Sequence, residues 1–107
     1  MEFENTLEQM LAAARKAAGG HWNVVSKFLE KEFTQAKEDA EGIALEVAAG
    51  TKTPDQAKIE LESVKESLED VKLAVTVEAK AAAQEAINAA LDVLRSAVNS
   101  AAKVAIF

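Results

Sequence analysis

The side chains that could carry chemistry are few, and a histidine–tryptophan pair comes first among them. His21 and Trp22 are the only histidine and tryptophan of this 107-residue chain, and they follow two glycines. Histidine titrates near physiological pH, so such a pair at a glycine corner is one way to build a pH-sensitive or ligand-binding site. We favour a simpler interpretation, in which Trp22 fastens two helices together and His21 is a polar residue at a helix start.

Two groups of carboxylates are the next candidates, as ligands of a divalent ion. If the chain forms a helical hairpin, the two groups could face each other across it. We expect a solvated acidic face instead, because no histidine accompanies them. The Glu-x-x-His pair of ferritin-like sites is also missing, since Ala18 stands three positions before His21. The groups are Glu38, Asp39 and Glu41, and Glu66, Glu69 and Asp70.

Other catalytic and cofactor-binding arrangements have no support, so we predict no catalytic residue, no cofactor and no metal ligand. The chain has no cysteine, which excludes thiolate metal sites and disulfides. Apart from Ser26, which lies five residues after His21, its serines have no histidine close in sequence to serve as a base. The glycines match no phosphate-binding fingerprint, and we interpret Gly42 as a point of close helix approach. The protein is not expected to be an enzyme.

Composition and charge further restrict the kind of protein that this chain can form. Half of the chain is apolar and 28% is charged, which is a globular balance. The net charge of -6 argues against a nucleic-acid partner, because phosphates are bound mainly by lysine and arginine. No apolar run approaches the roughly 20 residues of a transmembrane helix, and the N-terminus lacks the order of a signal peptide. We therefore predict a single all-helical domain over residues 1–107, located in the cytoplasm.

The elements that must position these residues begin with a helix capped at Asn5. Asn5 and Glu8 resemble a capping box, and Gly19-Gly20 is a typical stop. An apolar stripe nevertheless continues through the glycines at helical spacing as far as Val47. The caps favour a break at Gly19-Gly20 and the register favours a hinge within one long helix, so both interpretations stay open. The residues that carry the stripe across are Ala14, Ala18, Trp22 and Val25.

A tight turn follows in the stretch AAGTKTPDQ. Gly50 suits the left-handed position after a helix, and Thr53 is an N-cap followed by Pro54 at the first helical position. Gln56 completes a capping box with Thr53. A short connection of this kind between two long helices predicts an antiparallel helical hairpin.

After Pro54 a heptad seam runs to Val75, and the β-branched stretch Val75–Val77 is the weakest helical segment. The fold class is therefore all-α. We expect two long arms, Asn5–Ala49 and Pro54–Ile106, that assemble into a helical bundle as a homodimer or higher oligomer. The alternative is a monomeric up-down four-helix bundle with a bend near Val75–Val77.

In the alanine-rich last quarter of the chain, the apolar arc covers more than half of the helix circumference. A surface helix needs only about 100° of apolar arc, so this one is expected to touch two neighbours. A lone hairpin offers one neighbour, and the second is then another subunit or a helix made by folding the chain back once more. The interface candidates are Ala79, Ala83, Ala86, Ala90, Leu94, Ala97, Ala101, Ile87, Leu91 and Val98.

These patterns predict a structural or interaction protein that self-associates through its C-terminal helix. One alternative is an amphipathic protein that binds a lipid or granule surface. The composition is similar to that of alanine-rich granule-coating proteins such as phasins, but no motif is shared, and the polar stripe is close to neutral where lipid-binding helices are basic. A second alternative is a metal-binding bundle that uses the clustered carboxylates.

Overall fold

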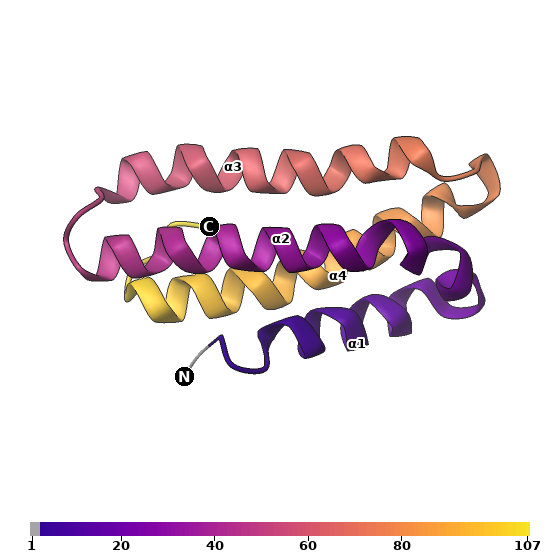
Figure 1. The fold of residues 1–107 in the computed structure, drawn as a ribbon, viewed down its shortest axis with the longest axis horizontal. Coiled ribbons are helices and arrows are strands. Elements are labelled where there is room, and N and C mark those ends of the chain that lie inside the picture. The colour runs from indigo at the N-terminus through magenta and orange to yellow at the C-terminus, as the bar shows by residue number, and fades with distance from the viewer. Residues whose placement is uncertain (1–2) are drawn as a thin grey trace.

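The structure, a computed structural model, describes residues 3–107, which are mainly helical (Figure 1). The all-α expectation is confirmed. Two single-turn 3₁₀ helices separate the longer elements at one end of the molecule. The elements are α1 (Thr6–Ala18), η1 (Gly19–His21), α2 (Trp22–Ala48), α3 (Pro54–Asp70), η2 (Val71–Ala74) and α4 (Val77–Ala102).

Helix α1 buries one stripe and ends at the glycines. Asn5 occupies the N-cap but makes no side-chain capping bond, so the capping box expected with Glu8 is not formed. At the other end Gly19 has φ 57° and ψ -129°, a backbone conformation that glycine adopts without strain. The chain reverses there, and α1 lies antiparallel to α2 (Figure 1).

The hairpin between α2 and α3 forms as predicted. Gly50 is left-handed with φ 81°, and Thr51 N–H donates to the Glu46 carbonyl at 2.9 Å, which closes the end of α2. Gln56 N–H donates to the Thr53 hydroxyl at 3.2 Å. Thr53 N–H donates in return to the Gln56 side chain at 3.1 Å, which completes the capping box before α3.

A third reversal separates α3 from α4. Val75 and Thr76 are extended, with ψ 159° at both residues, and Val75 buries its side chain in the core. The bend lies where the β-branched stretch weakens the helix. A single α3–α4 arm from Pro54 to Ile106 is therefore not formed.

The two long arms that we expected are each folded in half. Gly19 permits the first reversal, and the Val75–Thr76 segment permits the second. The chain therefore buries its apolar stripes against its own helices. The molecule measures 44 × 24 × 18 Å with a radius of gyration of 13.7 Å, close to the ~13 Å of a compact 100-residue domain. The alternative four-helix arrangement, with its bend near Val75–Val77, is the one that the structure has.

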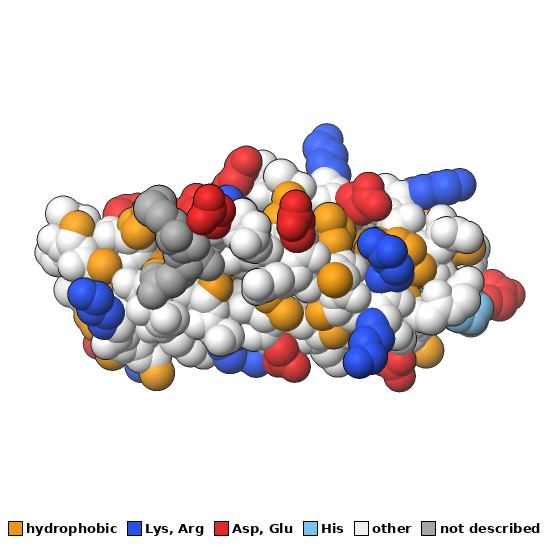
Figure 2. Space-filling model, turned by 90° about the horizontal axis from the view of Figure 1, so that it is seen from below, with side chains coloured by type: hydrophobic (Ala, Val, Ile, Leu, Met, Phe, Trp, Pro, Cys, Tyr) orange, Lys and Arg blue, Asp and Glu red, His pale blue; other side chains and the backbone are white. Residues whose placement is uncertain are grey.

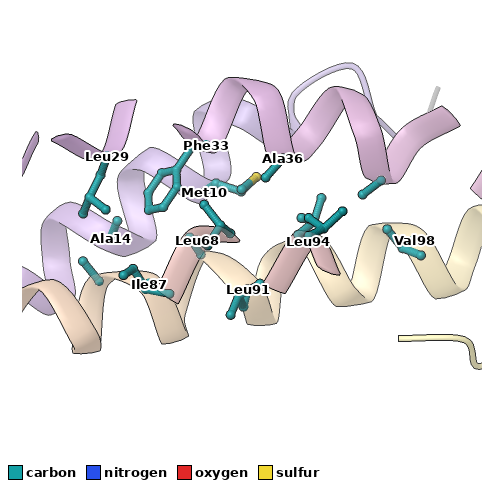
Figure 3. Packing of buried hydrophobic residues seen from close by; sticks show 14 of the residues in the cluster. Met10, Ala14, Leu29, Phe33, Ala36, Leu68, Ile87, Leu91, Leu94 and Val98 are labelled. Carbon is teal, nitrogen blue, oxygen red and sulfur yellow. The ribbon is translucent and has the colours of Figure 1, made fainter. Parts of the chain in front are cut away.

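Three of the four helices form the centre of the bundle. Helices α1, α2 and α4 all pack against one another, and the α1–α4 contact is the most extensive. Helix α3 lies on α2 and touches α4 only slightly (Figure 1). One hydrophobic cluster joins all four helices, and Figure 3 shows Met10 and Phe33 in it together with Leu94 of α4.

Candidate functional site

The alanine-rich face of α4 lies inside the folded chain. Its two neighbours are α1 and α2 of the same chain, so the second neighbour comes from folding the chain back, and a single chain covers this face without a partner. Ala97 is half-buried. The other interface candidates are buried: Ala79, Ala83, Ala86, Ala90, Leu94, Ala101, Ile87, Leu91 and Val98.

Two residues of the polar stripe of α4 secure the end of the chain. The stripe consists of Lys80, Gln84, Asn88, Asp92, Arg95 and Asn99, together with Lys103 directly after the helix. The Asn99 side-chain oxygen accepts from the main-chain N–H groups of Ile106 and Phe107, and Ile106 is buried as a result. The Arg95 guanidinium lies over the Phe107 ring. The sequence did not predict this role of Asn99, because nothing local indicates that the chain turns back.

The predicted hinge and its histidine–tryptophan pair lie at one end of the bundle. His21 is exposed in η1, and Trp22 is half-buried against the core at the start of α2. Trp22 therefore fastens the reversal to the core, as the simpler interpretation expected. Gly19 and Gly20 form the turn itself.

The two groups of carboxylates do not come together. Among residues 3–107, no three histidine, aspartate or glutamate side chains are arranged to hold a metal ion. Glu38 and Asp39 line a groove between α2 and α3, whereas Glu41 pairs with Lys37 at 3.5 Å on its own helix. The metal-binding hypothesis therefore has no geometric support in this part of the chain.

A groove with a volume of about 640 Å³ lies between α2 and α3. It exists because small side chains occur where the two helices lie side by side. Gly42 is exposed there and a Cβ atom on it would meet nothing within 4 Å, so Gly42 is not the close-approach point that we expected. Ser63 and Ser67 of α3 leave similar space on the opposite wall.

The groove has an apolar floor and acidic walls. Ala36, Ile43, Val64 and Leu68 are buried residues that form its floor. Helix α2 contributes four carboxylates to its walls, and α3 contributes one. The acidic residues that line it are Glu32, Glu38, Asp39, Glu46 and Glu60.

Near the hairpin turn, a lysine bridges two of the carboxylates that line the groove. The Lys52 ammonium donates a hydrogen bond to Glu60 and lies 3.6 Å from the Glu46 carboxylate. The pKa of Lys52 is raised, mainly by the hydrogen bond with Glu60. Lys52 thus offsets the negative charge at this end, and the charge that remains is concentrated toward Glu32 and Glu38.

Three further observations bear on the kind of protein. None of the helices formed by residues 3–107 is both long and apolar enough to cross a bilayer. On the face seen in Figure 2, hydrophobic side chains are interspersed with lysine or arginine and with carboxylate groups. Searches of protein-family models, curated proteins and solved structures give no match to this chain.

Proposed function

We propose that the protein is a non-catalytic interaction protein that binds a helix of another protein in the groove between α2 and α3. The observation that carries this proposal is the pairing of an apolar floor with a row of carboxylates along the α2 wall. Amphipathic helices commonly bind in grooves of this kind, with apolar residues at every third or fourth position directed to the floor.

The chemistry of the groove specifies the partner. The side chains that face the floor should be apolar, because the floor is made of buried apolar residues such as Ala36 and Val64. Lysine or arginine should flank that stripe, since Glu32, Glu38 and Asp39 lie along one wall. Such charges contribute mainly to the association rate and to the choice of partner.

The competing functions have less support. A lipid surface would require a broad apolar face, and the apolar face of α4 is covered by α1 and α2. The carboxylates along the groove would also be repelled by anionic lipids. Self-association through α4 stays a prediction. Because α1 and α2 cover the apolar face of α4 in the folded chain, it requires α4 to leave one of these helices and pack against another copy.

A synthetic probe tests the groove directly. The probe is an 18-residue amphipathic helix with an alanine–leucine stripe flanked by lysines, titrated into the ¹⁵N-labelled protein. We expect amide shifts that cluster around Gly42, Ser63 and Ser67. Shifts spread over all acidic surfaces would contradict a specific groove, and so would equal competition by spermidine, which carries charge without an apolar stripe.

Two matched variants separate charge at the groove from charge in general. Glu32→Lys combined with Glu38→Lys reverses one wall and should weaken probe binding by at least tenfold. Glu66→Lys combined with Glu85→Lys makes the same change in net charge outside the groove, because neither residue lines it. Equal weakening by both pairs would overturn the proposal.

A further inference from the structure

We propose that the chain also forms a domain-swapped dimer, in which α1–α2 and α3–α4 each straighten into one long helix and two copies exchange their α1–α4 halves. The occupant of the core surface on α2 and α3 is then a second copy of this chain. This inference does not depend on the groove. The outcome of the probe-binding experiment does not affect it, and the outcome of the dimer experiment does not affect the proposed groove.

The position of the reversals makes the exchange feasible. The η1 turn and the η2–Thr76 turn lie at the same end of the molecule, opposite the turn that joins α2 to α3 (Figure 1). Both turns contact neighbouring helices there, η1 touching α4 and η2 touching α2. If both open, α1 and α4 move outward together, and the α1–α4 contact, the most extensive in the molecule, is kept within one chain.

The register of the buried residues is continuous across both reversals. Ala14 and Val25, both 0% exposed, are eleven residues apart on either side of η1. Leu68 and Ala79 are also buried and eleven residues apart across the second turn. Eleven residues differ from three helical turns by only about 20°. A closed turn does not require this spacing, whereas a straight helix with one buried face does.

The directions of the helices are the same before and after exchange. In the single chain α1 is antiparallel to α2 and α4, while α2 and α4 are parallel (Figure 1). A twofold axis across the open end places the outgoing α1 antiparallel to the partner's α2, and the outgoing α4 parallel to it. Each contact of the monomer therefore recurs between copies, which is how domain swapping forms dimers at low cost.

Gly19 and Gly20 hold the first reversal, and their replacement supplies the first test. A Cβ atom at either position would meet nothing within 4 Å, so alanine introduces no collision. Alanine at Gly19 is strained at φ 57° in the closed turn but fits a straight helix. Gly19→Ala combined with Gly20→Ala should raise the dimer association constant on the order of 100-fold or more.

A control separates the hinge from helix propensity in general. Gly42 lies inside α2, and a Cβ atom there also meets nothing within 4 Å. Gly42→Ala should raise the melting temperature and leave the dimer association constant within threefold of the parent, because α2 is helical in both forms.

A blocking variant tests the second reversal. Thr76 has φ -66° and follows an extended residue, which is the backbone that proline requires. Thr76→Pro therefore fits the closed turn, but it would break a continuous α3–α4 helix. When Thr76→Pro is added to Gly19→Ala/Gly20→Ala, the dimer association constant should fall by at least 100-fold relative to the glycine double variant. If Thr76→Pro alone unfolds the chain, Thr76→Gly replaces it, with a smaller effect in the same direction.

Light scattering with size-exclusion chromatography and small-angle scattering measure the outcome. We expect the glycine double variant to form a dimer whose length is close to twice the 44 Å of the monomer, with unchanged helicity. A monomeric mass at millimolar concentration overturns the proposal, as does a dimer that is not elongated or one that aggregates with loss of helicity. A dimer that survives the block at Thr76 shows that α3 and α4 do not straighten, and it overturns the two-hinge exchange.

Discussion

The side-chain oxygen of Asn99 accepts hydrogen bonds from the main-chain N–H groups of Ile106, at 2.9 Å, and Phe107, at 3.0 Å. The amide nitrogen of Asn99 donates to the main-chain oxygen of Phe107 at 3.3 Å. These bonds turn the chain back after α4 and hold Ile106 against the core, where it is 3% exposed. One polar residue on the helix surface thus fixes the position of a buried apolar one.

Replacing Asn99 should therefore destabilise the protein more than its surface position indicates. We expect Asn99→Ala to lower the free energy of unfolding by about 1–3 kcal/mol, because three hydrogen bonds of roughly 1 kcal/mol each are lost. Urea unfolding measures the change. Asn88→Ala, on the same stripe but away from the chain end, is the control, and an equal effect at both positions would contradict the role of Asn99.

Ala90 tests whether the buried face of α4 is covered. Ala90 is 0% exposed, so Ala90→Glu places both bulk and an unpaired charge in the core. We expect a loss of helicity and of cooperative unfolding, because the cost is large on the scale of the roughly 5–15 kcal/mol that stabilises a domain. Circular dichroism melts measure it.

The control for Ala90 is two residues away. Asn88 is exposed, and Asn88→Glu should change the free energy of unfolding by less than about 0.5 kcal/mol. If Ala90→Glu keeps the melting temperature of the parent, α1 and α2 do not cover this face in solution.

The local chemistry of a turn is readable from sequence, whereas the choice between straight and folded arms is not. Gly50, Thr53 and Pro54 specify the α2–α3 hairpin within a few residues, and the structure confirms it. In contrast, the eleven-residue spacing from Ala14 to Val25 is compatible both with a straight helix and with a chain that reverses between them. Whether the chain reverses depends on contacts between α1 and α4, which lie far apart in sequence.

The groove was missed for a related reason. The sequence identified Gly42 as unusual, but a glycine inside a helix leaves space whether or not another helix fills that space. Ser63 and Ser67 contribute to the groove only because the hairpin sets them opposite Gly42. The pairing of small residues on two helices depends on the hairpin register, which periodicity alone did not determine.

Thr53 gives a quantitative test of the hairpin turn. Thr53→Ala removes the hydroxyl that accepts from Gln56 N–H, and we expect a loss of about 1 kcal/mol in the free energy of unfolding. Thr53→Ser keeps an accepting hydroxyl and should restore most of that loss. Thermal or urea unfolding of the two variants checks the prediction, and equal stabilities would show that the capping bond contributes little.

Lys52 predicts how stability changes in alkaline solution. Its hydrogen bond to Glu60 raises its pKa above the ordinary value near 10.5, so the folded chain holds this proton more tightly than the unfolded chain. The resulting stabilisation is fully present below pH 10.5 and is lost as the pH rises through the higher folded value. Because the pair is close to solvent, we expect a modest effect that weakens with added salt.

A comparison of two lysine variants isolates that effect. Lys52→Met should remove the alkaline loss of stability that this group contributes and lower stability slightly at neutral pH. Lys31 is exposed on α2, so Lys31→Met should leave the pH dependence of the parent unchanged. Urea unfolding at pH 8 and pH 11.5 measures both. If Lys52→Met loses as much stability between these values as the parent does, the ammonium does not link the end of α2 to α3, and the hairpin is held by its capping box and core contacts alone.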